Sequence, residues 1–269
     1  HHNYEKLIER LSVFRPNLLH CLCPSRLSLT RKLARRLNVP YVLSLNSGSM
    51  PLSRTALKSR YMRGIITPDE RVKAGFIKEN YRLKDKVTKI NMGTFVSDSP
   101  RCFENSHKLT SLVAACPLRP DDMELFLKAV KYLIITGYEF LLIIIGNGRS
   151  EKQLRRMLES LGISPLTVIV PRLEPWRSVL SAGDIYVRVE PGNYFDPLML
   201  EAMGTGVAVA ACENGPDELA LDGETAVMFD PADELDIVDA LKKLLGAHEK
   251  ARKMAASAQK HLRRDRKST

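Results

Sequence analysis

Short apolar segments alternate along the chain with longer segments in which apolar residues recur at helical spacing. Short apolar runs predict buried strands, and the longer period predicts amphipathic helices. Strands that alternate with helices are typical of a parallel sheet that is covered by helices on both faces. The chain is therefore expected to be an α/β protein.

In the first part of the chain, apolar runs predict strands at residues 17–22, 41–45, 64–67 and 87–91. Helical periods predict helices at residues 4–14 and 25–37 and from Asp69 onward. Residues 97–107 are polar, contain Pro100 and show no period, so we interpret them as a linker. A first domain is therefore expected at residues 1–107.

The second part of the chain repeats this alternation, with strands expected at residues 109–116, 140–145, 167–170, 184–189 and 207–211. Residues 140–145 are entirely apolar, which indicates a central strand buried on both faces. A second domain is expected at residues 108–235. One long amphipathic helix is expected from Asp233 toward Arg263, and a disordered basic tail at residues 263–267. Residues 236–269 thus form a C-terminal helix and tail.

Charge is distributed unevenly along the 269 residues, whose net charge is +10. Residues 1–107 carry 20 Lys and Arg against 8 Asp and Glu, whereas residues 108–241 carry 11 against 21. The densest basic cluster lies on one predicted helix and comprises Arg26, Arg31, Lys32, Arg35 and Arg36. Such a face could simply be solvated, or it could bind an anionic membrane surface or a phosphorylated acceptor. Nucleic acid is disfavoured because no nucleic-acid-reading module is visible.

The composition is that of a globular protein, with 44% hydrophobic and 27% charged residues. No apolar run approaches the length of a membrane span. The five cysteines are scattered, which favours reduced thiols in a cytoplasmic protein over a disulfide framework. Cys21 and Cys23 have metal-like spacing, but a zinc site would need two further ligands.

One stretch, residues 187–211, combines the end of a predicted strand, a polar loop, a helix and a further strand. Pro197 suits the first helical position, and the glycines at 204 and 206 end the helix. Unpaired amides at such a helix start, together with the positive end of the helix dipole, favour an anion.

This stretch resembles the donor-site signature of the GT-B glycosyltransferases, in particular retaining family 4, which reads Glu-x-Phe-Gly-x-x-x-x-Glu-Ala-Met-(Ala/Gly)-x-Gly. The matching residues are Phe195, Glu201, Ala202, Met203, Gly204 and Gly206. Residues 214–219 and 222–231 resemble the family's next loop and strand. The resemblance implies two Rossmann-like domains that face a cleft.

The resemblance also implies an activity: transfer of a sugar from a nucleotide-diphosphate sugar, held by the second domain, to an acceptor held by the first. It implies no metal and no further cofactor. Glu201 stands where the family binds the donor ribose. Loop and helix residues expected around the donor are Phe195, Asp196, Pro197 and Leu198, and the turn with Gly146 and Gly148 resembles the family's Gly-x-Gly loop beside the nucleotide.

Several positions depart from the family pattern. Asn193 replaces the glutamate that addresses the transferred sugar, and Asn46 stands where many relatives have a histidine; these two are the candidate catalytic residues. Cys116 and Asp121 replace the arginine and lysine of the phosphate clamp. The cations that could compensate are Arg119, Arg149 and Arg172. Asp196 replaces a glycine.

Two hypotheses follow. The chain could be a divergent hexosyltransferase acting on an unidentified acceptor, lipid-linked or polysaccharide, in the cytoplasm and at the inner face of the membrane. Alternatively, it could be a catalytically impaired member that acts as a nucleotide-sugar sensor or as the partner of an active transferase. The family's earlier strands are not seen, so the first domain is expected to be incomplete. Either this chain lacks residues of the natural protein, or another surface, such as a protein partner, covers the exposed sheet edge. A polyanion-binding module is a third class.

Overall fold

The computed structural model describes residues 2–48, 52, 57–105, 108–117, 119–146, 148, 150–171, 176–192, 194–213 and 218–265. The chain divides into two compact units. The first unit comprises residues 1–92 and 193–195, and the second comprises residues 93–192 and 196–269.

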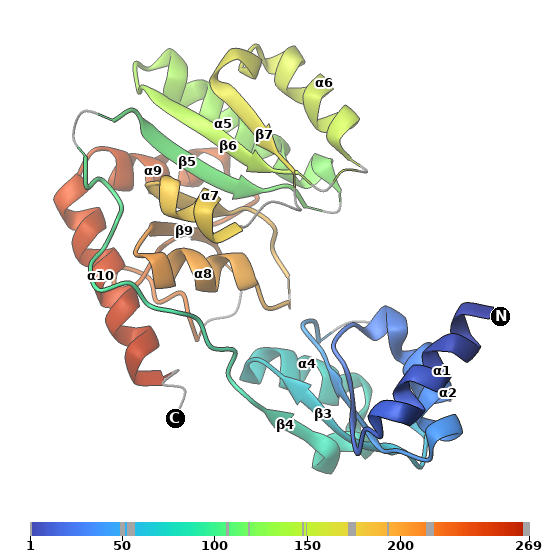
Figure 1. Cartoon of the computed structure of the whole chain (residues 1–269). Coiled ribbons are helices and arrows are strands. Elements are labelled where there is room, and N and C mark those ends of the chain that lie inside the picture. The colour runs from blue at the N-terminus through green and yellow to red at the C-terminus, as the bar shows by residue number, and fades with distance from the viewer. Residues whose placement is uncertain are drawn as a thin grey trace. The chain divides into compact units, whose positions relative to one another are not determined.

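The first unit is a parallel sheet with the strand order β1-β2-β3-β4 (Figure 1). Its strands are β1 (Leu19–Cys21), β2 (Tyr41–Ser44), β3 (Met62–Thr67) and β4 (Val87–Lys89), and its helices are α1 (His2–Phe14), α2 (Leu27–Leu37) and α4 (Glu70–Glu79). Helix α2 buries Leu27, Thr30, Leu33 and Ala34, which share one face at helical spacing. It packs that face on β1 and β2 beside α1.

The second unit is a larger parallel sheet with the strand order β10-β9-β8-β5-β6-β7. Its strands are β5 (Thr110–Ala115), β6 (Phe140–Ile145), β7 (Thr167–Val170), β8 (Ile185–Arg188), β9 (Ala208–Cys212) and β10 (Val227–Phe229). The first strand in sequence, β5, lies between β6 and β8. The direction of winding therefore reverses between β5 and β8, and the loops that follow these two strands diverge. In open α/β sheets, ligands bind in the crevice at such a reversal.

Helices pack on both faces of this sheet, as the alternating pattern predicts. They are α5 (Glu124–Ile135), α6 (Glu151–Leu161), α7 (Trp176–Ala182), α8 (Pro197–Thr205), α9 (Glu234–Leu245) and α10 (His248–Asp265). The fully apolar run predicted as a central strand is β6, and it contributes Phe140, Leu142 and Ile144 to the core. The α/β class predicted from the sequence is confirmed.

The single long C-terminal helix predicted from the sequence is wrong. Helix α9 ends at Leu245, and α10 begins at His248 and packs against α8, α9 and β9. Gly246 closes α9, its amide donating to the Lys242 carbonyl at 2.9 Å, and glycine has a low helix propensity. The disordered tail expected at residues 263–267 is also wrong for residues 263–265, which belong to α10. Residues 266–269 lie outside the described part of the chain.

Residues 93–105 form an extended segment that packs on the second unit. The amide of Ser97 donates to the Gly204 carbonyl at 2.8 Å, and that of Arg101 donates to the Gly206 carbonyl at 3.0 Å. The buried Gln259 of α10 donates its side-chain N–H to the Ser97 carbonyl at 3.1 Å. This segment is therefore held between α8 and α10 (Figure 1).

Among the described residues, no helix combines the length and the apolar character that a bilayer crossing requires.

Gly206 ends α8 with a φ of +79° where the 93–105 segment passes closely. An added Cβ would lie 2.6 Å from Pro100 Cα and 2.7 Å from Gln259 Nε2. We expect Gly206→Ala to lower the free energy of unfolding by about 2–4 kcal/mol, because left-handed strain adds to overpacking. Gly223→Ala is the matched control, since Gly223 has a φ of +72° and open space around it; its expected loss is about 1 kcal/mol. Urea denaturation measures both, and equal losses would contradict the packing argument.

Candidate functional site

The candidate site lies where the loops after β5 and β8 leave the second sheet. Cys116 directly follows β5, and the loop after β8 leads into α8. Because all strands of this sheet are parallel, these residues share its carboxyl edge at the reversal of strand order. Cys116 and the loop that leads into α8 are therefore brought to one part of the sheet.

The start of α8 is capped by the chain itself. Asp196 is the N-cap residue, and its Oδ1 accepts a hydrogen bond from the Leu198 amide at 2.9 Å. Its Oδ2 accepts a second hydrogen bond, from the Tyr186 hydroxyl of β8, at 2.8 Å. Pro197, which lies between Asp196 and Leu198 in the sequence, has no amide proton to donate. A side chain of the protein itself thus caps the helix start, at the position where the resembled signature has glycine.

Asp196 is only 6% exposed. Burial raises the pKa of its carboxyl above the ordinary value, while the Tyr186 hydrogen bond and the Arg188 charge oppose that shift. Arg188 ends β8, is 2% exposed and donates from Nη2 to the Gly192 carbonyl at 3.2 Å. Sequence reasoning missed Arg188, although an arginine that ends an otherwise apolar strand is an unusual residue to bury.

Glu201, the candidate ribose ligand, lies one turn into α8 and is partly exposed. Its Oε2 pairs with Nη1 of Arg177 from α7 at 2.8 Å, and its Oε1 accepts from the Thr94 hydroxyl at 2.7 Å. Arg177 also donates from Nη2 to the Phe95 carbonyl at 2.8 Å. Two segments outside α8, residues 93–105 and α7, thus fix the carboxylate, and nothing in the motif identifies Arg177 or Thr94 as its partners.

The described residues proposed for a phosphate clamp do not gather around the start of α8. Cys116 is buried, and desolvation with the nearby Glu190 carboxylate raises the pKa of its thiol to about 11, so it is neutral. The Arg119 side chain is 79% exposed and pairs with Asp122 at 3.1 Å. Asp121 accepts from Gln153 at 2.7 Å. These positions therefore supply no cation that is aimed at the helix start.

The two glycines after β6 have different roles. Gly146 donates its amide to the Val170 carbonyl at 2.9 Å and lies close to the Ile169 side chain, so its smallness serves packing. Gly148 has a φ of +72° with open space beside it. It lines a hollow of about 510 Å³ together with the charged face of α6. Of these two glycines, only Gly148 is placed to approach a ligand.

The remaining candidates lie elsewhere or outside the described residues. Asn46 is exposed just after β2 in the first unit, and its carbonyl accepts from the amide of the buried Phe195 at 2.7 Å. Asn193, Arg149 and Arg172 lie outside the described part of the chain. Among the described residues, no three His, Cys, Asp or Glu side chains are grouped as metal ligands.

A family model described as "Glycosyl transferases group 1" matches residues 110–247, just over half of the chain. No curated protein sequence matches the chain significantly. The matched region spans the second sheet from β5 to α9.

Several solved structures are similar to this chain in fold at low sequence identity. The crystal structure of Anabaena HepE in complex with UDP-glucose has a TM-score of 0.78 at 16% identity, covering 97% of this chain and 77% of that chain. A glycosyltransferase from Rickettsia africae has a TM-score of 0.74 at 12% identity, covering 98% and 76%. Sucrose-phosphate synthase from Thermosynechococcus elongatus has a TM-score of 0.70 at 15% identity, covering 97% and 72%. Identities this low show the GT-B-like fold alone.

The buried Asp196 predicts a pH-dependent stability. A carboxyl whose pKa is raised by folding stabilises the folded state while protonated, and that contribution is lost as pH rises from the ordinary value of 3.8 through the raised pKa. Asp196→Asn stays uncharged, so we expect wild type to lose stability relative to this variant as pH rises toward neutrality. Asp233→Asn, which alters the exposed N-cap of α9, is the matched control for the capping bond. Chemical denaturation across pH measures the difference, and parallel curves for wild type and Asp196→Asn would contradict the burial argument.

Proposed function

Because the chain belongs to the glycosyl transferases group 1 family, we propose that it transfers a sugar from a nucleotide-diphosphate sugar to an acceptor. We assign it to the retaining, metal-independent hexosyltransferases of family 4. The donor would occupy the carboxyl edge of the second sheet at the reversal between β5 and β8. This edge is where an open α/β sheet offers a crevice to a nucleotide.

The observation that carries this proposal is the position of Glu201. Its carboxylate is partly exposed, one turn into α8, and each oxygen already accepts one hydrogen bond from the protein. A carboxylate offers about four acceptor sites, so both oxygens retain capacity for the hydroxyls of a ribose. Arg177 and Thr94 would hold the carboxylate in place before the ligand arrives, which lowers the entropy lost on binding.

The roles around the diphosphate are part of the same proposal. Without a metal, the departing diphosphate must be neutralised by helix amides and by cationic side chains. Arg188 is a buried cation at this edge and would contribute positive charge. Arg149 or Arg172 would replace the cations that the phosphate clamp lacks. Asn193 and Asn46 would hydrogen-bond the reacting groups as neutral amides.

The classes of donor and acceptor are also part of the proposal. The HepE structure is a complex with UDP-glucose, so we take uridine nucleotides as the first donor class to test. We propose a lipid-linked or polysaccharide acceptor. We also propose a cytoplasmic location, which suits a protein with reduced cysteines, and binding of the basic first unit to an anionic membrane surface. We also keep the proposal of a protein partner on the first sheet.

A second candidate function is favoured by Asp196. Its buried carboxylate occupies the Leu198 amide and adds negative charge where the diphosphate would lie. Charge repulsion in a partly desolvated site weakens anion binding. The alternative is therefore an impaired family member that acts as a nucleotide-sugar sensor or as the partner of an active transferase.

We expect UDP or UDP-glucose to raise the melting temperature, because a ligand that binds the native state stabilises it. Glu201→Gln should weaken that binding by about tenfold or more, since a charge-assisted hydrogen bond is lost. Glu249→Gln, in the first turn of α10, is the matched control and should bind as wild type does. Protection by none of UDP, GDP and ADP at millimolar concentration would contradict the enzyme proposal, and release of free sugar or of product tests turnover.

Asp196→Gly restores the residue of the family pattern and frees the Leu198 amide. We expect it to tighten UDP binding by about tenfold, because a buried anion is removed and an amide donor is gained. The N-cap is lost as well, so the variant should be less stable by about 1–2 kcal/mol. Asp233→Gly loses an equivalent cap on α9 and should leave UDP binding unchanged. Binding to Asp196→Gly but not to wild type would favour the partner of an active transferase over both the enzyme and the sensor; unchanged affinity would show that Asp196 does not oppose the diphosphate.

A further inference from the structure

Helix α2 of the first unit has one apolar and one strongly basic face. Its buried face packs on the sheet, and the remaining surface carries Arg31, Lys32, Arg35 and Arg36 within two turns. Like charges at this spacing repel one another, so the cluster destabilises an isolated helix. Such an arrangement favours an anion that would offset the repulsion.

These four side chains form one wall of a groove of about 830 Å³. The other wall is residues 58–61, which enter β3 and add Lys58 and Arg60, and Tyr4 of α1 also lines it. Arg60 is oriented by a hydrogen bond from Nη2 to the Tyr61 hydroxyl at 2.8 Å, and that hydroxyl bonds the Asn38 side chain at 3.3 Å.

In the described part of the chain, no acidic side chain lines this groove. The nearest acidic residues in sequence to the lining residue Tyr4 are Glu5 and Glu9 of α1. Among the described residues, none of its six cations is paired with a carboxylate. A solvated basic face usually alternates with acidic residues at helical spacing, and α2 has no acidic residue at all.

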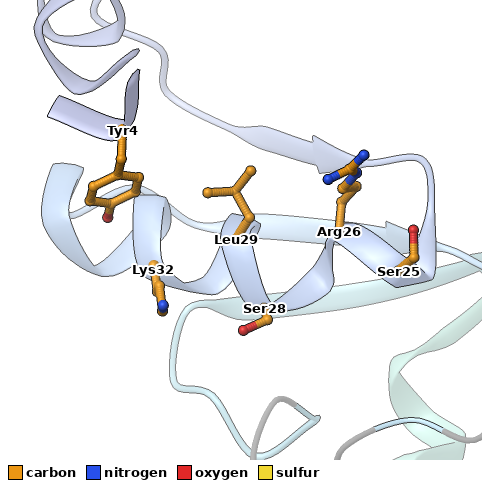
Figure 2. Close-up of a pocket in the computed structure, with 6 residues that line it drawn as sticks. All are labelled: Tyr4, Ser25, Arg26, Ser28, Leu29 and Lys32. Carbon is orange, nitrogen blue, oxygen red and sulfur yellow. The ribbon is translucent and has the colours of Figure 1, made fainter. Parts of the chain in front are cut away.

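A second hollow of about 470 Å³ adjoins the groove, and Figure 2 shows the residues that line it. Tyr4 and Lys32 line both, and the second hollow adds Arg26 and the hydroxyls of Ser25 and Ser28. In Figure 2, Ser28 and Lys32 point to the same side of α2. Hydroxyl and cationic donors thus extend the groove without any added negative charge.

The groove lies at the amino ends of the strands of the first sheet. The last turn of α2 precedes β2, and residues 58–61 directly precede β3. Asn46 follows β2 and so marks the opposite, carboxyl edge, where parallel sheets place their reacting ligands. The groove of about 830 Å³ therefore lies at the opposite end of β2 from Asn46, the residue of the first unit proposed to act in sugar transfer.

We propose that this groove binds a ligand with clustered phosphate groups, either a soluble polyphosphorylated molecule or the phosphate headgroups of a lipid surface. Guanidinium groups bind phosphate through paired N–H donors, and ammonium groups add point charge. Four of the six cations are arginines, on both walls, so several phosphates can be contacted together. The inference goes beyond sugar transfer and does not depend on a bound nucleotide; in its lipid arm it deepens the proposed anionic membrane surface by naming the groove and the phosphate chemistry that it would bind.

Two probes distinguish the sources. Inositol hexakisphosphate, titrated by calorimetry, represents the soluble ligand. Vesicles of phosphatidylcholine with and without phosphatidylglycerol, separated by sedimentation, represent the headgroup surface. Binding to at least one phosphate probe is expected, and it should weaken steeply with added salt because charge contacts are screened.

The decisive comparison uses two variants with equal loss of charge. The groove variant replaces Arg31, Lys32, Arg35 and Arg36 with glutamine. The control variant replaces four other cations with glutamine, all on or after α4 and before the outer strand β4: Lys78, Arg82, Lys84 and Lys86. We expect the groove variant to lose affinity by about tenfold or more and the control by about twofold or less. A second groove variant, Lys58→Gln with Arg60→Gln, tests the other wall and should lose about threefold or more.

Melting curves confirm folding of each variant, and the second groove variant keeps the test informative if the first does not fold. Equal losses in groove and control variants would overturn the proposal, because net charge alone would explain binding. Absence of binding to both probes would overturn it as well. Tighter binding to a single-stranded oligonucleotide than to either probe would also overturn it. None of these results depends on UDP, so the proposal stands or fails separately from sugar transfer.

Discussion

The carboxylate of Asp196 joins the central strand β8 to the first turn of α8, and the geometry of the candidate donor site depends on that link. One oxygen closes the helix start at Leu198, and the other receives the Tyr186 hydroxyl. Because the group is buried, its bonds are not shared with solvent, and each is worth more than at the surface. Under the proposed function the same carboxyl group would lie where a diphosphate binds, so helix capping and anion affinity would be opposed at one residue.

Residues 93–105 give the site its second constraint. They pass along α8 and contribute Thr94 and Phe95 to the arrangement that holds Arg177 and Glu201. Gly204 permits that passage, since an added Cβ would lie 2.9 Å from the Phe95 carbonyl oxygen. The glycine of the signature thus acts through packing, and the carboxylate that would meet a ribose is positioned by a segment outside the signature.

The chain uses the edges of its sheets differently. The carboxyl edge of the second sheet carries buried and partly buried polar groups that are bonded to one another, as in a preorganised site. The amino edge of the first sheet carries cations with no acidic partner among the described residues. Buried polar groups that are hydrogen-bonded to one another favour binding of one defined ligand. An exposed basic groove favours electrostatic binding of anions, which weakens with added salt.

The sequence by itself determined the elements and the family resemblance. The apolar run that is β6, the proline that opens α8 and the glycine that ends it are local signals, and each acts within a few residues of its own position. The separation of α9 from α10 was missed, because Gly246 is a weak stop whose effect is decided by the packing of α10 on α8 and β9.

The tertiary structure alone decided which side chains meet. Arg177 reaches Glu201, Arg188 becomes buried beside Asp196, and residues 58–61 complete a groove with α2. These contacts join different elements of the fold, and they follow from strand order and close packing, which no local pattern of hydrophobic and polar residues specifies.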